Sequence, residues 1–244
     1  MYAGPRFLLA GDSALVVEFG DKVSPDIYVK VRKLFLYLEK LTPKGIKEAV
    51  PTYRSLMIHY NPLELPLQTL RSKLEKAILE SANMPLPRSR RITVPVKYGG
   101  EYGPDLKDVA AHNKITPEDV IRIHSSIDYL VYMIGFTPGF PYLGEPPRSI
   151  ACPRLTTPRV KVPAGSVGIA GTLTGIYPRE SPGGWRLIGR TPLKLFNERS
   201  NPPSLLQAGD YIRFLSITET DYERILKETQ AGDYQPETQQ IEKQ

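Results

Sequence analysis

The sequence has 244 residues, of which 41% are hydrophobic, and a formal net charge of +6 at pH 7. This length suffices for one large domain or two ordinary ones, and the single cysteine, Cys152, has no partner for a disulfide within the chain. No hydrophobic run approaches the roughly 18–20 residues of a membrane span, and the first residues do not follow the pattern of a signal peptide. We therefore expect a cytoplasmic protein without disulfides and without membrane contact.

The first part of the chain alternates strand and helix patterns. Strands are predicted at four places, residues 7–9, 14–19, 46–50 and 54–59. Helices are predicted after Ser24, an N-cap followed by Pro25, and after Pro66, each with an apolar stripe at helical spacing. A last strand over residues 92–96 is predicted to close the sheet. This order favours an α+β domain over residues 1–97, with two helices on one face of an antiparallel sheet as in ferredoxin-like folds.

Residues 98–230 have the pattern of a second, mainly β domain. Three short helices are predicted, over residues 105–112, 117–124 and 220–229. Thr116 and Asp119 have the spacing of a capping box for the second of them. Short apolar segments separated by turns occupy residues 127–134, 160–162, 167–169, 185–188, 193–196 and 211–214. Such spacing favours a β-barrel or sandwich, and the polar tail, residues 231–244, is predicted to be disordered.

The region between Phe136 and Arg213 is rich in turns and in positive charge. It holds 12 of the 24 prolines and 10 of the 19 glycines, and ten Lys and Arg residues against four acids. Glycine and proline at this density mark tight turns. The basic residues are scattered among the turns instead of following a helix face, which argues against nucleic-acid binding and favours a small anionic ligand.

The glycines near Ser166 have two interpretations. The segment is not a nucleophile elbow, because Ala164 stands where that motif requires glycine, and it is neither a dinucleotide-binding fingerprint nor a P-loop. The glycines either form turns and bulges or belong to a loop whose backbone N–H groups face an anion. The residues assigned to a substrate or anion site are Arg159, Lys161, Gly165, Ser166, Gly168, Gly171, Thr174, Arg179, Ser181, Gly184, Trp185 and Arg190.

Two side chains are candidates for acid–base catalysis. His124 either packs or caps at the end of its helix, or donates a proton beside the loop of residues 135–144. Glu180 is either an ion-pair partner or a catalytic carboxyl group, and its basic surroundings oppose the raised pKa that the second role needs. The three histidines and Cys152 do not have the spacing of metal ligands, so no metal site is predicted.

Three aromatic residues, Phe136, Phe140 and Tyr142, lie in the loop GFTPGFPYLG at residues 135–144. They either pack beneath the loop or form the wall of a pocket or a partner interface, where rigid aromatic side chains carry much of the binding energy. We expect Phe140 and Tyr142 to form one continuous surface with the four cations Arg159, Lys161, Arg179 and Arg190.

Several blocks of the sequence resemble one family. They are LAGDSA at residues 9–14, PTYRSL at 51–56, GFTPGFPYLG at 135–144, VPAGSVGIAG at 162–171, TGIYP at 174–178, ESPGGW at 180–185 and LIGRTP at 187–192. In these blocks the chain is similar to the KipI-like proteins, also called the B-type subunit of 5-oxoprolinase or allophanate hydrolase subunit 1. The chain departs from the common family pattern at Leu173, where a glutamine is usual, and this puts the identity of the substrate in question.

The resemblance implies an N-terminal ferredoxin-like domain and a C-terminal cyclophilin-like β-barrel. It also implies a component of an ATP-dependent 5-oxoprolinase, which converts 5-oxo-L-proline to L-glutamate together with a KipA-like C-type subunit and a LamB/YcsF-like A-type subunit. ATP then serves the assembled complex, and we expect the isolated chain to be inactive. Two other roles that the family suggests are inhibition of a sensor histidine kinase and a carboxyltransferase-like partnership with a biotin-dependent enzyme of urea or allophanate metabolism.

Overall fold

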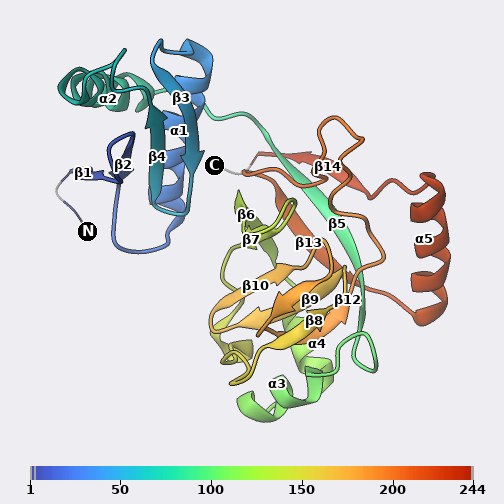
Figure 1. Cartoon of the computed structure of the whole chain (residues 1–244). Helices are drawn as coiled ribbons and strands as arrows, with labels where there is room; N and C mark the ends of the chain where they lie inside the picture. Colours follow the sequence, from blue (N-terminus) through green and yellow to red (C-terminus); the bar gives the residue numbers. More distant parts are fainter. Residues whose placement is uncertain (1, 3, 243–244) are drawn as a thin grey trace. The chain divides into compact units, whose positions relative to one another are not determined.

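The computed structural model describes Tyr2 and residues 4–242, which form two compact units (Figure 1). The first unit ends at Pro87 and the second begins at Arg88. Each unit has an apolar core of its own. No helix among the described residues is long and apolar enough to cross a membrane.

The first unit is an antiparallel sheet with two helices. Its strands are β1 (Arg6–Leu9), β2 (Ala14–Glu18), β3 (Ile46–Pro51) and β4 (Ser55–Tyr60), and its helices are α1 (Pro25–Leu41) and α2 (Leu67–Ser81). Ser24 caps α1 as predicted, because its Oγ accepts a hydrogen bond of 3.2 Å from the backbone N–H of Ile27. The predicted apolar stripes pack in one core with β4 through Leu34, Leu70, Leu74, Leu56 and Ile58.

The sheet differs from the prediction at one edge. Its strand order is β1-β2-β4-β3, so β4 lies between β2 and β3, the two strands that α1 connects. The edge beside β2 is filled by β1, whereas the predicted closing strand at residues 92–96 belongs to the second unit. The hairpin of β1 and β2 therefore supplies the strand that we expected from the far end of the domain.

The second unit is a closed β-barrel. Its strands are β5 (Ser89–Tyr98), β6 (Asp128–Ile134), β7 (Pro141–Leu143), β9 (Ser166–Ala170), β10 (Leu173–Ile176), β12 (Arg186–Arg190) and β13 (Tyr211–Ser216). They follow the order β12-β9-β10-β7-β6-β13-β5, and β5 pairs again with β12 through Tyr98 and Gly189. This closure matches the expected cyclophilin-like barrel.

Helices and a short strand pair complete the second unit (Figure 1). They are α3 (Leu106–Asn113), α4 (Pro117–Ser125), α5 (Glu219–Ala231), the short 3₁₀ turn η1 (Arg148–Ile150), and β8 (Arg159–Val162) paired with β11 (Ser181–Gly183). The predicted capping box of Thr116 and Asp119 opens α4. The strand predicted over residues 193–196 is wrong: these residues form a loop whose Leu193 and Leu195 are buried, so the apolar spacing marks burial without a strand.

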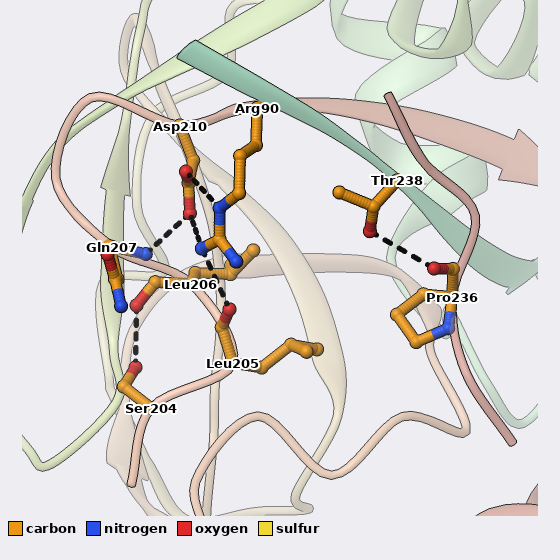
Figure 2. Close-up of polar contacts among 8 residues, drawn as sticks. All are labelled: Arg90, Ser204, Leu205, Leu206, Gln207, Asp210, Pro236 and Thr238. Atoms are coloured by element: carbon orange, nitrogen blue, oxygen red, sulfur yellow. Dashed lines mark hydrogen bonds and ion pairs between the residues drawn. The ribbon is translucent and has the colours of Figure 1, made fainter. Parts of the chain in front are cut away.

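The boundary between the units lies before β5, and the predicted boundary at residue 97 is too late. β5 pairs with β13 over residues 91–96 and with β12 over residues 97–98, which makes it a barrel strand. Arg90 strengthens this attachment through two hydrogen bonds, 2.9 Å from Nε and 2.6 Å from Nη2, to the buried carboxylate of Asp210 (Figure 2). A strand pattern gives no information about which sheet a strand joins.

The described part of the predicted disordered tail contains a strand, β14 (Thr238–Ile241), so that prediction is wrong there. β14 pairs antiparallel with the first residues of β5, from Thr238 opposite Ile92 to Ile241 opposite Ser89. Figure 2 shows Thr238 donating a hydrogen bond of 3.1 Å to the carbonyl of Pro236 beside this strand. Backbone pairing to the edge of β5 orders a segment whose polar composition alone predicts disorder.

Candidate functional site

Four aromatic side chains from the family-like blocks meet on the outer face of β9 and β10. We call them the aromatic cluster: Phe140, Tyr142, Tyr177 and Trp185. The Phe140 ring is central, with ring centroids 5.2 Å from Tyr142, 5.5 Å from Tyr177 and 5.7 Å from Trp185. The rings meet edge to face, which is a favourable geometry for aromatic pairs. Phe140 is buried and Tyr142 half-buried, so they form the base of this surface and not its exposed wall.

The glycines of the predicted anion loop are explained by packing and turns. Gly168 and Gly175 are opposite each other on β9 and β10. A Cβ on Gly175 would lie 2.8 Å from Cζ3 of Trp185, and a Cβ on Gly168 would lie 3.1 Å from Cβ of the same residue. Gly165 and Gly171 have φ of +79° and +61°, which are turn conformations that favour glycine. The first of the two interpretations, turns and close packing, therefore accounts for all four positions.

The loop of residues 135–140 is closed by its own backbone. Gly135 N–H donates to the carbonyl of Phe140 at 3.0 Å, and Phe140 N–H donates to that of Thr137, also at 3.0 Å. Thr137 N–H donates across one residue to the carbonyl of Gly135 at 2.8 Å, which places Phe136 at the apex of a tight turn with φ +65°. Phe136 is 66% exposed and its ring centroid lies 5.6 Å from that of Phe140.

On the inner side of β10, His124 lies within a chain of hydrogen bonds. Its Nδ1 is 2.8 Å from the Tyr98 hydroxyl, and its Nε2 is 2.9 Å from Oγ1 of Thr174. Thr174 donates its own hydroxyl proton to the carbonyl of Gly168 at 3.0 Å. Thr174 must therefore accept a proton from Nε2–H, and Nδ1 accepts one from Tyr98.

This position corrects one catalytic prediction. The His124 ring is fully buried and stacks on Phe214 with 4.4 Å between the ring centroids. Burial lowers the pKa of His124 from 6.5 to about 3, so the ring is neutral at ordinary pH. Because both ring nitrogens bond inside the barrel, His124 holds α4 to β10 and does not present a proton to a bound ligand.

Arg159 is bound next to the aromatic cluster by an acid that the sequence analysis did not select. Its Nη2 lies 2.7 Å from Oδ1 of Asp105, and its Nη1 donates to the carbonyl of Trp185 at 3.4 Å. Asp105 is buried and also accepts the backbone N–H of Leu187 at 2.7 Å. The available signal was an acid immediately before the predicted helix, which the helix assignment treated only as a terminus.

The other predicted cations are dispersed. Lys161 lies 3.4 Å from Glu180, and both side chains are exposed, so Glu180 forms an ion pair, the first of its two expected roles. Arg179 is exposed in the turn between β10 and β11. Arg190 lies over the ring of Tyr102, 5.7 Å from its centroid, and Tyr102 in turn packs against Tyr222 of α5. Only Arg159 of the four predicted cations is shown in contact with a cluster residue, so the predicted continuous surface is confirmed only in part.

Several polar atoms of the predicted site are buried without a hydrogen-bond partner among the described residues. They are Oγ of Ser166, Oγ of Ser181 and Nε of Arg190. Ser166 and Arg190 are opposite each other on β9 and β12. Leu173 packs against the aromatic cluster, and the carbonyl of Gly184 accepts the N–H of Leu155 at 2.8 Å. Cys152 is buried, which raises the pKa of its thiol, and no metal-binding group of three His, Cys, Asp or Glu residues occurs in the described part of the chain.

Comparisons with known proteins agree with these features. Residues 5–206 match the family described as carboxyltransferase domain, subdomain C and D. The chain is 42% identical over 229 residues to the B-type subunit of 5-oxoprolinase from Bacillus subtilis, covering 90% of this chain and 95% of that protein.

Two solved structures are also similar. A conserved uncharacterized protein, PH0987 of Pyrococcus horikoshii, is 46% identical, with 89% of this chain and 100% of that chain covered and a TM-score of 0.54. TTHA0988 is 36% identical with a TM-score of 0.74; the match covers 84% of this chain but spans only 39% of that longer chain. The chain thus belongs to the carboxyltransferase subdomain C and D family and, within it, to the B-type subunits of 5-oxoprolinase.

Proposed function

We propose that this chain is the B-type subunit of an ATP-dependent 5-oxoprolinase that converts 5-oxo-L-proline to L-glutamate. The observation that carries the proposal is the 42% identity to a curated 5-oxoprolinase subunit of this type over 95% of that protein. The family-like blocks supply the aromatic cluster and the residues around it. We therefore place the functional surface on the outer face of the barrel.

The substrate of this reaction carries a carboxylate and a cyclic amide. Such a ligand needs cationic and N–H or O–H donors, preferably shielded from water. The unpartnered hydroxyls of Ser166 and Ser181, the Nε of Arg190, and the exposed Arg179 support a contribution of this chain to that recognition. Ring opening also needs the amide carbonyl to be activated through ATP, and for this step we propose residues of the assembled complex.

The partners that we propose are a KipA-like C-type subunit and a LamB/YcsF-like A-type subunit. The curated relative is described as one lettered subunit among others, which supports a multi-subunit enzyme. The longer TTHA0988 chain, of which the match spans only 39%, supports an arrangement in which these two units work beside further domains. The small anionic substrate then binds where this chain and a partner meet.

Reconstitution tests this function directly. The chain is purified alone and together with the KipA-like and LamB/YcsF-like chains of the same genome, and 5-oxoproline-dependent ATP hydrolysis and glutamate release are measured. We expect no turnover by the single chain and turnover by the three-chain mixture, with loss of turnover when this chain is omitted. Turnover by the chain alone, or equal turnover without it, overturns the proposal.

The family description favours a second candidate, a carboxyltransferase-like partner of a biotin-dependent enzyme. This role predicts transfer of a carboxyl group from carboxybiotin to urea or a related amide when the chain is mixed with a biotin carboxylase. The absence of such transfer, in a mixture that hydrolyses ATP only with 5-oxoproline, decides for the first function.

For the first unit we propose a permuted ferredoxin-like class. The order β1-β2-β4-β3 supports it, because β2, β4 and β3 have the order of a split βαβ unit and β1 takes the place of the strand that would follow α2.

A further inference from the structure

We propose that Phe136 is the anchor by which this chain docks onto the partner chain that carries the rest of the carboxyltransferase domain. The inference rests on the proposed function, and it adds the contact residue and the kind of surface that receives it. The surface on the partner is an apolar pocket that accepts one aromatic ring.

The first observation is the exposure of the Phe136 ring. Phe136 is 66% exposed, whereas Phe140, four residues later, is 2% exposed and forms the centre of the aromatic cluster. The cluster is therefore closed without Phe136, whose ring touches it only through the edge-to-face contact with Phe140. Large aromatic side chains that remain exposed are typical of interface hot spots.

The second observation is the backbone conformation. Phe136 has φ +65°, a left-handed conformation that glycine or asparagine adopts more readily than a residue with an aromatic side chain. The hydrogen bond from Thr137 N–H to the carbonyl of Gly135 closes the tight turn around it. An exposed phenylalanine at this position does not improve the stability of the free chain. Strain of this kind is concentrated at functional positions.

The third observation is that the loop is already ordered for binding. The backbone hydrogen bonds between Gly135, Thr137 and Phe140 fix both ends of the turn. Gly139, with φ +83°, packs so closely on Phe196 that a Cβ there would lie 2.7 Å from Cβ of Phe196. A ring held this way loses little conformational entropy when it enters a pocket, so more of its contact energy contributes to affinity.

The occupant follows from the extent of the family match. The matching family comprises only subdomains C and D of a carboxyltransferase domain, and the match spans 39% of the TTHA0988 chain. The remaining subdomains must then reach this chain from another polypeptide, which is the KipA-like chain of the proposed function. An apolar anchor on a rigid loop is suited to a lasting contact between such subunits.

The test uses Phe136→Asn, which removes the ring and keeps a residue that tolerates the left-handed conformation. The matched control is Val160→Asn, a replacement of an apolar side chain that is 81% exposed on the same unit. Affinity for the purified KipA-like chain is measured by titration calorimetry, and the melting temperature of each variant is measured alone. We expect Phe136→Asn to bind at least about tenfold more weakly, with an unchanged or higher melting temperature, and Val160→Asn to bind like the parent chain.

Binding of Phe136→Asn within about twofold of the parent overturns the inference, as does an equal loss in both variants. A change from dimer to monomer in Phe136→Asn without loss of partner affinity also overturns it, because the occupant is then a second copy of this chain. The two proposals fail separately. If the parent binds the partner through Phe136 but the full mixture does not hydrolyse 5-oxoproline, only the enzymatic proposal falls; if Phe136→Asn forms a fully active complex, only the docking proposal falls.

Discussion

His124 and Thr174, 50 positions apart in the chain, share a hydrogen bond of 2.9 Å between Nε2 and Oγ1 inside the barrel. The next residue of β10, Gly175, faces the opposite side, where it lies under the Trp185 ring. The bond therefore fixes, from the core, the strand whose outer face carries the aromatic cluster. Trp185 is the single tryptophan of the sequence, so its fluorescence reports directly on this region.

Replacing His124 by leucine should destabilise the barrel by about 2–3 kcal/mol, because the buried hydroxyl of Tyr98 loses its acceptor and Thr174 loses its donor. Urea unfolding followed by Trp185 fluorescence measures the change. The matched control is His112→Leu, at an exposed position of α3, which should alter the free energy of unfolding by no more than about 0.5 kcal/mol. Equal effects of the two replacements would show that the buried chain of hydrogen bonds contributes nothing.

The stability of the barrel should fall as the pH is lowered. The pKa of His124 is about 3 in the folded chain, and that of an unfolded histidine is about 6.5. Below pH 6.5 the unfolded chain binds the proton and the folded chain does not, so the free energy of unfolding falls by up to about 1.4 kcal/mol per pH unit down to the folded pKa. Above that range the contribution is fully present.

Comparison with His124→Leu isolates this effect from the titration of carboxylates. Unfolding free energies are measured between about pH 7 and about pH 5, where the parent chain should lose stability more steeply than the variant. Parallel curves would contradict the assignment of the slope to His124.

The ion pair of Arg159 and Asp105 should matter more than that of Lys161 and Glu180. Arg159→Ala leaves the buried Asp105 carboxylate without its cation and should cost about 2–4 kcal/mol of stability. Lys161→Ala breaks an exposed pair and should cost at most about 1 kcal/mol. Chemical denaturation of both variants measures the difference, and a larger loss for Lys161→Ala would refute this ranking.

Gly175→Ala should disturb the aromatic cluster. The added methyl group would lie 2.8 Å from Cζ3 of Trp185 and 3.1 Å from Cζ of Phe140, and such overpacking costs about 1–3 kcal/mol. The fluorescence maximum of Trp185 and the melting temperature should both change. Gly184→Ala is the control, because its nearest neighbours lie 3.6 Å or more from the new Cβ. Similar spectra and melting temperatures for the two variants would rule out close packing at Gly175.

Much of the local structure could be predicted from the sequence. The cap of Ser24, the capping box at Thr116, the apolar stripe of α2 and the first hairpin all form as predicted. Each depends on residues a few positions apart, whose side chains meet whenever the local backbone conformation forms. The turn-rich blocks also indicated the region in which the aromatic cluster lies.

The tertiary structure alone decided which distant segments meet. The sheet that β5 joins, the edge that orders β14, and the acid that holds Arg159 each depend on residues far apart in the chain. The same holds for His124, whose pattern fits a surface base as well as a core residue, and for Arg190, which lies over Tyr102. Sequence patterns record whether a side chain tends to be buried and how the backbone turns. They do not record which neighbour supplies the buried hydrogen bond or opposite charge, because that partner is set by the closure of the barrel.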